Sequence, residues 1–422
     1  MSTPTTAARR PLGENGWTGG QYSLIRATVG AYLLVHFVHL IPWAGETFSN
    51  AGMLPEGAAS PLMKLFPSVL LINDSPAFVQ LLLAIAGAAA VAFLLGWRDR
   101  VAAILMWYVL ACLFGRNPMT ANPSLPFVGW MLLAHACLPV VPYGSLVARG
   151  RVDPAGSWRF PPAIFAGAWV LMALGYSYSG YTKLISPSWV DGSALHHVLE
   201  NPLARPTWLR EFLLSLPAEL LQWATWGGLG LELAFAPLAI IRRIRPFIWL
   251  AMLMMHVSLM VLIDFADLSF GMVLLHLFTF NPAWIPARRG GRPLEVFFDG
   301  HCGLCHGFVR FALAEDRRGG LVFAPLDGET FRDRVSSAGA TLPDSLTVLG
   351  DDGQLLARSA AVGRVLGALG GLWRVASVVL AAVPRPIADA AYDIVARNRR
   401  RLGRPEEACP LLPPGLRARM LP

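Results

Sequence analysis

Two cysteines separated by two residues are the feature of this sequence that most clearly could do chemistry. They lie in "FFDGHCGLCHGF", residues 297–308, between an apolar run and a segment with helical periodicity. The thiolate is the reactive form of cysteine, and a helix N-terminus favours it. We expect Cys302 at the start of that helix and Cys305 one turn later. The spacing therefore predicts that Cys302 attacks a disulfide and Cys305 resolves the mixed disulfide.

Two alternatives use the same residues. His301, Cys302, Cys305 and His306 resemble a set of four zinc ligands, but adjacent residues rarely converge on one tetrahedral ion and the chain has no second CxxC. The other alternative is a pair of unreactive thiols. We favour redox chemistry and expect no bound metal. Cys409, in "EEACPLLPP", is either a third thiol that folds back or a surface residue.

The elements that would position the dithiol follow Pro293. Alternating and helical patterns predict a βαβ arrangement followed by ββα, which is typical of a small α/β domain with a thioredoxin-like fold over 294–422. A basic amphipathic helix in the tail would lie near anionic lipid. The predicted elements are strands at 294–299, 321–326, 345–350 and 354–359, helices at 303–316 and 360–383, and the tail helix at 385–404.

Composition places the rest of the chain in a membrane. The 422 residues suffice for two or three domains. A content of 55% hydrophobic residues and only 15% charged residues indicates an integral membrane protein. No basic stripe with interleaved aromatic residues accompanies the net charge of +8, so we exclude nucleic acid as a partner. Five cysteines do not form a disulfide framework. Cys112 and Cys137 lie in apolar runs and are expected to be small hydrophobic residues.

Apolar segments of about 20 residues predict a polytopic α-helical membrane domain over 21–286. A polar segment, 1–20, precedes it without the apolar core of a signal peptide, and a linker, 287–293, follows it. The pattern predicts about eight transmembrane helices, or seven if a short third or eighth segment does not span. They lie near 22–42, 77–97, 101–116, 124–142, 161–182, 218–241, 246–264 and 267–285.

Arginines in the loops predict the orientation. They gather in alternate loops, and such residues collect on the cytoplasmic side. This pattern predicts a multi-pass protein of the bacterial inner (plasma) membrane with both termini in the cytoplasm. The dithiol would then face a reducing compartment. Lys183, at the end of the fifth predicted helix, would face the opposite side of the membrane.

Lys183 is unusual in a chain with 35 basic residues of which only two, Lys64 and Lys183, are lysines. A buried lysine can lose its proton, whereas arginine stays charged. The lysine therefore indicates a functional site that uses an amine able to lose its proton. The alternative is that a lysine occurs at position 183 by chance, because Lys64 shows that the chain also uses lysine elsewhere.

The C-terminal third resembles the DCC thiol-disulfide oxidoreductase family. The resemblance rests on "DGHCGLC", "LVFAPL", "SLTVL", "LARSAAVGRVL", "LGGLW" and "PRPIADAAYDIVARNRR", and it covers 294–412. It implies that Asp299, Cys302 and Cys305 form the signature site and that the partner is a disulfide-bearing protein or a small thiol. Ala388 departs from a basic residue expected in the family. Pro343 stands near the position of a thioredoxin-type cis-proline.

Residues 20–285 resemble the HTTM family, which is related to the vitamin K-dependent γ-carboxylase. The motifs are "SLIRATVG", "YSYSGYTKLISPSWVDGSALHHVL", "LELAFAPLAII" and "LMMHVSLMVL". The resemblance implies a bound membrane lipid or quinone. The chain lacks the large lumenal domain of the carboxylase, so glutamate carboxylation is not expected. The implied site comprises Lys183 as base, Trp189, Asp191 and Gly192 in the loop beside it, Glu232 and His256 as inward-facing partners, and the early Arg26.

The sequence thus predicts a membrane-bound thiol-disulfide oxidoreductase with a CxxC dithiol on the cytosolic side and a carboxylase-like membrane domain that binds a quinol or lipid. No cofactor is certain, and a membrane quinone is the candidate. The alternative is a non-enzymatic lipid-binding or transport scaffold whose dithiol senses redox state.

Overall fold

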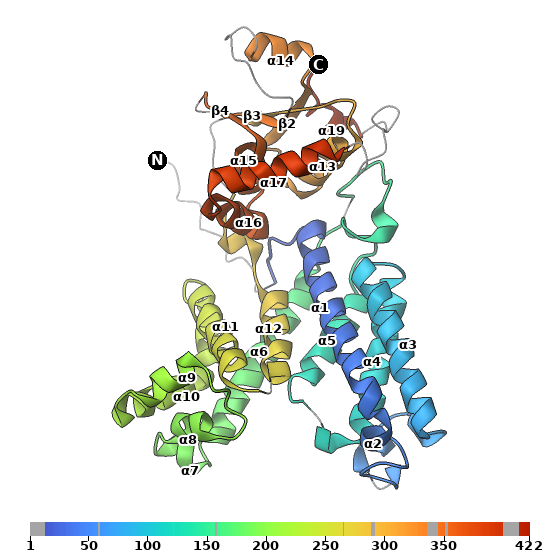
Figure 1. The fold of residues 1–422 in the computed structure, drawn as a ribbon, viewed down its shortest axis with the longest axis vertical. Helices are drawn as coiled ribbons and strands as arrows, with labels where there is room; N and C mark the ends of the chain where they lie inside the picture. The colour runs from blue at the N-terminus through green and yellow to red at the C-terminus, as the bar shows by residue number, and fades with distance from the viewer. Residues whose placement is uncertain are drawn as a thin grey trace, which may run out of the picture. The chain divides into compact units, whose positions relative to one another are not determined.

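A computed structural model of the chain describes residues 13–57, 60–120, 122–156, 158–264, 266–287, 292–335, 345–350, 353–399 and 413–422. Its internal contacts divide the chain into two compact units, which we treat separately (Figure 1). The helical unit consists mainly of Ile25–Leu138 and Pro161–Phe280. The sheet unit consists of Asn15–Leu24, Pro139–Phe160 and Asn281–Pro422.

A helix lies in each of the eight segments that the apolar pattern predicts. In the helical unit α3 packs on α4, α4 on α5, α10 on α6 and α11 on α12. Short helices between α6 and α10 are α7 (Pro187–Val190), α8 (Ala194–Glu200) and α9 (Trp208–Leu214). The helices in the eight predicted segments are α1 (Gly19–Leu40), α3 (Pro76–Leu95), α4 (Asp99–Arg116), α5 (Leu125–Ala136), α6 (Pro162–Lys183), α10 (Ala218–Ile240), α11 (Arg245–Leu262) and α12 (Ala266–Thr279).

The prediction of eight membrane spans is not confirmed. By length and composition, four helices of the described chain could cross a membrane, and a fifth candidate is a strongly bent pair of helices near the C-terminus. The four are Gly19–Phe48, which includes α1 and the short α2 (Ala44–Phe48), and then α3, α6 and α11.

Prolines explain why two predicted spans are short. The helix α5 ends at Ala136, shortly before Pro139, and α12 ends at Thr279, shortly before Pro282. Proline lacks the N–H that a helix interior needs, and it disfavours helical backbone in the residue before it. With 12 and 14 residues, and a rise of about 1.5 Å per residue, the two helices fall short of the roughly 30 Å hydrocarbon core.

The sheet unit contains the predicted four strands in one mixed sheet, in the order β2-β1-β3-β4. The strand β1 pairs in parallel with β2 and antiparallel with β3, and β3 pairs antiparallel with β4. The strand bounds are β1 (Leu294–Phe298), β2 (Leu321–Pro325), β3 (Thr347–Leu349) and β4 (Leu355–Ala357).

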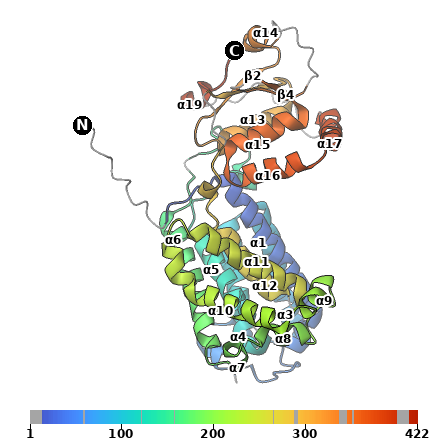
Figure 2. The same cartoon turned by 90° about the vertical axis from the view of Figure 1, so that its left-hand side faces the viewer.

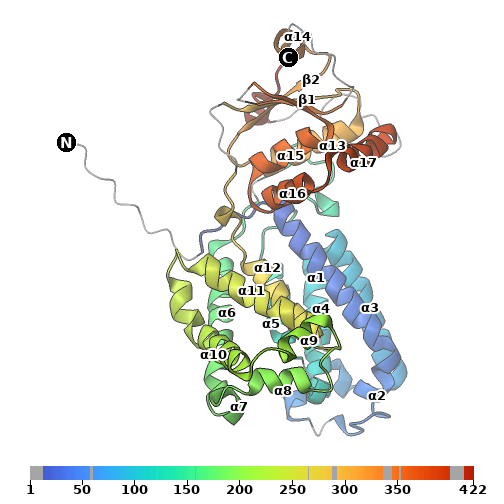
Figure 3. The same ribbon diagram turned by 60° about the vertical axis from the view of Figure 1, so that its left-hand side comes forward.

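Helices cover both faces of this sheet. On one face, Val296 and Phe298 of β1 pack in a core with Val309 of α13 and Val365 of α15. On the other face, Phe297 packs against Phe331 of α14. Figures 2 and 3 show α13 and α15 on one side of the strands and α14 on the other. The helices are α13 (Gly303–Glu315), α14 (Glu329–Arg334), α15 (Arg358–Leu369), α16 (Gly371–Ala382), α17 (Arg385–Arg397) and α19 (Pro414–Arg417).

Two predicted elements of this unit were wrong in their bounds. The single helix expected at 360–383 is broken into α15 and α16, because Gly370 and Gly371 take positive φ angles of 77° and 57°. A side chain at Gly370 would also approach the backbone nitrogen of Ala287 to 2.8 Å. The strand expected at 354–359 ends at Ala357, since Arg358 already begins α15.

The C-terminal residues add an edge to the sheet that the sequence did not predict. Phe323 of β2 donates its N–H to the carbonyl of Arg419 and accepts the N–H of Leu421. The short α14 was also not predicted. Residues 419–421 therefore pair with the edge strand of this sheet.

Among the described carboxylates of the sheet unit, Glu315 at the end of α13 is the most enclosed, with 1% of its surface exposed. It accepts a hydrogen bond from the Thr18 hydroxyl, from the Gly20 N–H at 2.8 Å and from the Trp373 ring N–H at 2.6 Å. Burial raises the pKa of Glu315, and the bonds from Thr18 and Trp373 oppose this. The Glu315 side chain therefore links Thr18 and Gly20 to Trp373, which lies far from them in the sequence.

We expect Glu315→Ala to lower the free energy of unfolding of the sheet unit by about 3 kcal/mol, because three donors would lose their buried acceptor. Glu315→Gln keeps the shape and one acceptor oxygen and should cost less. Hydrogen exchange of α13 and α16, followed by mass spectrometry, measures both. Glu329→Ala, at an exposed position of α14, is the control. Equal protection in Glu315→Ala and the control would contradict this role.

Candidate functional site

Cys302 occupies the N-cap of α13, as the spacing predicted. Its backbone is extended (φ −103°, ψ 113°), and its Sγ accepts a hydrogen bond from the Cys305 N–H at 3.4 Å. Only 7% of Cys302 is exposed. A backbone donor aimed at sulfur at a helix N-terminus stabilises negative charge there. The geometry suits Cys302 to act as a nucleophile.

Cys305 has the opposite character. Its pKa is raised to about 12, chiefly by burial and also by the neighbouring Cys302 and Asp299, while Arg399 opposes the increase. At neutral pH Cys305 is therefore a protonated thiol. Neither Cys302 nor Cys305 is in a disulfide in the structure.

Asp299 shapes the loop between β1 and α13. Its Oδ1 accepts the N–H of His301 at 2.9 Å, and its backbone carbonyl accepts the N–H of Cys302 at 3.3 Å. Its Oδ2 lies 3.2 Å from Nη2 of Arg399. Asp299 thus holds the turn that presents Cys302, and a distant arginine holds Asp299. Sequence reasoning missed Arg399, because 100 positions separate the two residues and nothing local links them.

The two histidines beside the dithiol make other contacts. His306 bonds through Nε2 to the Gly300 carbonyl at 2.8 Å, and Nε2 of His301 lies 3.4 Å from Oδ2 of Asp327. Within the described ranges, no group of three or more His, Cys, Asp or Glu side chains is placed to hold a metal ion. Pro343 and Cys409 lie outside the described residues.

The helix α17 packs on the sheet unit beside the start of β3. Tyr392 accepts the N–H of Leu346 at 2.8 Å through its hydroxyl. Ala388, where a basic residue was expected from the resemblance, is 7% exposed. A small apolar residue fits such a buried position. The expected lipid contact of this helix stays a prediction.

In the helical unit, the structure brings together Lys183, Glu232 and Trp189. The Lys183 Nζ lies 2.6 Å from both carboxylate oxygens of Glu232, and it lies 4.4 Å from the centre of the Trp189 ring. The side chain of Glu232 is 6% exposed and that of Lys183 is 23% exposed. The three residues come from α6, α7 and α10, and their predicted roles stay predictions.

Gly192 and Asp191 form the turn after Trp189. Gly192 has φ +85°, and a Cβ there would come within 2.3 Å of the Gln222 side chain. The Asp191 carbonyl accepts the Gln222 side-chain N–H at 2.7 Å, and its carboxylate accepts the Ser193 N–H at 2.8 Å. Only glycine fits this turn, which ties the loop to α10.

His256 lies in a buried aromatic and histidine cluster. Its ring centre is 5.8 Å from that of Tyr176 and 6.0 Å from that of His276. Tyr176 and His276 share a hydrogen bond of 2.7 Å. Neither ring nitrogen of His256 has a hydrogen-bond partner among the described residues. A buried imidazole in this state is available to a small polar ligand or a water molecule.

Arg26 takes part in a different charge cluster. Its Nη1 lies 3.9 Å from Oδ2 of Asp99, and Nε2 of His135 lies 3.5 Å from the same oxygen. Arg26 is 2% exposed. This cluster lies where α1, α4 and α5 meet. The structure therefore gives Arg26 a contact with Asp99 that the sequence prediction did not include.

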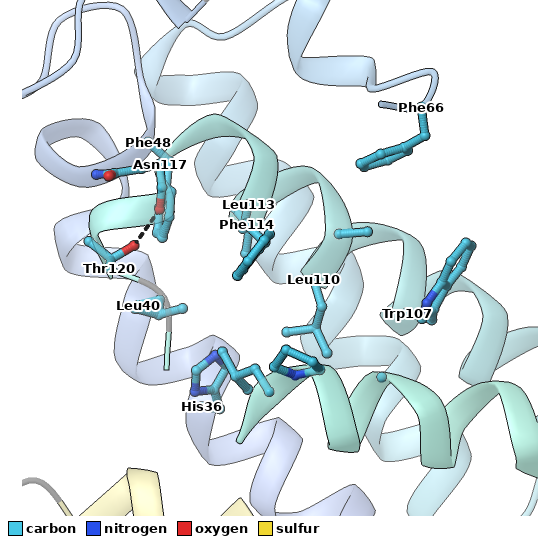
Figure 4. Close-up of a pocket in the computed structure, with 14 residues that line it drawn as sticks. His36, Leu40, Phe48, Phe66, Trp107, Leu110, Leu113, Phe114, Asn117 and Thr120 are labelled. Atoms are coloured by element: carbon cyan, nitrogen blue, oxygen red, sulfur yellow. Dashed lines mark hydrogen bonds between the residues drawn. The ribbon is translucent and has the colours of Figure 1, made fainter. Parts of the chain in front are cut away.

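The helical unit also contains an apolar pocket of about 350 Å³. Figure 4 shows His36 near Leu110 on one side of the pocket, and Asn117 with Thr120 at another. Neither Lys183 nor Glu232 is among the described residues that line it. The lining residues are His36, Leu40, Phe48, Phe66, Trp107, Leu110, Ala111, Leu113, Phe114, Asn117, Thr120, Leu125, Pro126 and Gly129.

Comparison with known proteins covers the part of the chain that holds the dithiol. Residues 296–405 match the model of the DCC1-like thiol-disulfide oxidoreductase family. Uncharacterized protein YuxK of Bacillus subtilis (strain 168) is 34% identical over 129 residues, which are 30% of this chain and 93% of that protein. No solved structure matches the chain. Through its C-terminal domain, with Cys302 and Cys305 at the start of α13, the chain belongs to the DCC1-like thiol-disulfide oxidoreductase family.

Proposed function

We propose that the chain is a membrane-bound oxidoreductase whose thioredoxin-like domain exchanges disulfides through Cys302 and Cys305. One observation carries the proposal: the Cys302 Sγ accepts the N–H of Cys305 at the N-terminus of α13, while the Cys305 thiol is held protonated. This asymmetry separates an attacking sulfur from a resolving one. The sheet order β2-β1-β3-β4 supports the thioredoxin-like assignment.

The dithiol would reduce a partner disulfide in two successive thiol–disulfide exchange steps. The Cys302 thiolate attacks one sulfur of a disulfide partner, so the partner's S–S bond breaks, a mixed disulfide forms and the first thiolate leaves with a proton from solvent. Cys305 then loses its proton and attacks Sγ of Cys302. The second thiol leaves, and the dithiol has given two electrons and two protons to the partner. A disulfide-bearing protein or a small disulfide can serve as the partner.

Alkylation at limiting reagent tests the asymmetry. With iodoacetamide at pH 7, we expect Cys302 of the full chain in detergent to react at least about tenfold faster than Cys305, because a pKa near 12 leaves Cys305 with almost no thiolate. Raising the pH from 7 to 9 should still leave Cys305 largely unlabelled. Peptide mass mapping at timed intervals measures both rates. Equal labelling of the two cysteines would contradict the assignment.

For the helical unit we propose an HTTM-like domain that binds a quinol or a lipid near Lys183. The support is the contact of Lys183 with Glu232 and Trp189, together with the unpartnered ring nitrogens of His256. A bound quinol would supply a hydroxyl proton. Because Nζ lies 2.6 Å from both oxygens of Glu232, the lysine–glutamate pair rather than the amine alone would take up that proton.

The apolar pocket of Figure 4 offers a second place for a lipophilic group in the same unit. Its volume is within the range of small-molecule sites, and its lining is apolar with a few polar groups, as such sites are. Mass spectrometry of lipophilic compounds that co-purify with the full chain tests this half of the proposal. Loss of the compound in Lys183→Met would support the lysine site. If the compound instead co-purifies with Lys183→Met but not with Leu110→Trp, the ligand binds in the apolar pocket rather than near Lys183.

The orientation we propose is that of a bacterial inner-membrane protein with cytoplasmic termini and a cytosolic dithiol. The alternation of arginine-rich loops supports it. A membrane-impermeant maleimide applied to intact cells should leave Cys302 unlabelled until the membrane is opened. The alternative is that the helical unit is a non-enzymatic scaffold or a transporter. Solute flux that Lys183→Ala leaves unchanged would support this alternative.

A further inference from the structure

A basic pocket of about 700 Å³ lies between the C-terminal part of α17 and the start of α15. Three arginines, Arg358, Arg397 and Arg399, line it together with one carboxylate, Asp393. Its remaining lining consists of Ala390, Ile394 and Ala396. The pocket thus combines an apolar helix face with an excess of positive charge, three arginines against one aspartate.

The contacts of these arginines show which of the guanidinium groups is not already paired with a carboxylate. Nε of Arg358 lies 3.5 Å from Oδ1 of Asp393, so the charges of these two side chains offset each other. Arg397 donates through Nε to the Asp393 carbonyl and, among the residues that the structure describes, forms no ion pair. The Arg397 side chain is exposed at the end of its helix. The pocket therefore presents at least one guanidinium to a ligand.

Arg358 is held in place by its backbone. It takes a left-handed conformation with φ +55°, which residues other than glycine rarely adopt. Its N–H donates to the Leu346 carbonyl next to β3. Such unfavourable backbone persists where the surrounding structure fixes it, and it is concentrated at functional sites. The side chain of Arg358 is thereby directed to the pocket that it lines.

Arg399 connects this pocket to the dithiol. It lines the pocket, and its Nη2 lies 3.2 Å from the carboxylate of Asp299, three positions before Cys302. Its positive charge also acts on Cys305. A ligand held by the arginines would therefore lie beside the loop that presents the attacking sulfur.

We propose that the basic pocket binds the carboxylate arm of a small anionic disulfide and so presents that disulfide to Cys302. The inference rests on the proposed disulfide exchange and adds the class of substrate. A guanidinium fork matches a carboxylate in two parallel hydrogen bonds, and the volume is that of a small-molecule site. Cys302 breaks the substrate's S–S bond, Cys305 closes the protein disulfide, and two small thiols leave with the two electrons and two protons.

Three disulfides of different charge test the proposal on the reduced full chain in detergent. They are oxidised glutathione, which is negative, hydroxyethyl disulfide, which is neutral, and cystamine, which is positive. For each, the second-order rate constant of the variant is divided by that of the unmodified chain, so that differences in intrinsic reactivity cancel. The variant is Arg397→Glu. Arg332→Glu, at an exposed position of α14 outside the pocket, carries the same change of charge and is the control.

In Arg397→Glu we expect the rate with oxidised glutathione to fall at least about threefold at low salt, the rate with cystamine to rise, and the rate with hydroxyethyl disulfide to stay the same. About 0.5 M salt should reduce these differences. Equal ratios for all three disulfides, or the same pattern in Arg332→Glu, would overturn the pocket as a substrate site while leaving disulfide exchange intact. A dithiol that reacts with none of the three would instead refute the proposed function itself.

Discussion

Replacing Cys302 with serine is expected to reduce the rate of disulfide reduction by at least about a thousandfold, whereas replacing Cys305 stops the reaction after its first step. The structure gives the reason. The Cys302 Sγ receives the N–H of Cys305 at the start of α13, and burial keeps Cys305 protonated until Cys302 has reacted. A serine at 302 leaves only the unreactive thiol. Stopped-flow mixing of the reduced chain with hydroxyethyl disulfide measures the rates.

The Cys305→Ser variant should instead accumulate one mixed disulfide on Cys302, because no second sulfur remains to release it. Cys112→Ser is the matched control, since this free cysteine is buried in α4 and far in sequence from the dithiol. Its rate should equal that of the unmodified chain. A Cys302→Ser variant that still forms the mixed disulfide through Cys305 would reverse the assigned order of attack.

The second large effect is expected at the buried ion pair of the helical unit. Lys183→Met leaves the carboxylate of Glu232, which is 6% exposed, without its cation, and breaking a buried pair in this way costs about 3 kcal/mol of unfolding free energy. Lys183→Met combined with Glu232→Leu removes both charges and should regain most of the loss. Thermal unfolding of the full chain in detergent measures the series.

Lys64→Met is the control for this series, because Lys64 is the chain's other lysine and lies exposed at the end of a short helical turn. It should leave the melting temperature unchanged. If Lys183→Met unfolds no earlier than Lys64→Met, the contact of Lys183 with Glu232 does not contribute to stability. In that case the pair would be no more than a surface interaction.

The dithiol could be located from sequence because its signals are local. An apolar strand pattern ending at Phe298, a short loop and a helical period starting at Gly303 fix Cys302 at a helix N-terminus. The four strands were recognisable for the same reason. The break at Gly370 and Gly371 was missed, because glycine within a helical pattern is often tolerated and the close approach of Ala287, which leaves no room for a side chain at Gly370, is not visible in the sequence.

The contacts that complete the sites could not be predicted, because they join residues far apart in the chain. Arg399 reaches Asp299 only after α17 has packed beside β3, and the final residues pair with β2 without any strand-like pattern of their own. The contact between Lys183 and Glu232 was expected only from the resemblance to another family. The prediction of eight spans is not confirmed, and the apolar content on which it was based continues past the ends of α5 and α12, each three residues before a proline.

The most direct test of the account is to map the product of a single oxidation. One equivalent of hydroxyethyl disulfide is added to the reduced full chain, and the product is analysed by intact mass and by peptide mapping under non-reducing conditions. We predict a chain lighter by two hydrogen atoms, with one disulfide that joins Cys302 to Cys305. A stable adduct on the unmodified chain, or a disulfide that involves Cys112 or Cys137, would contradict the assignment of attacking and resolving sulfurs.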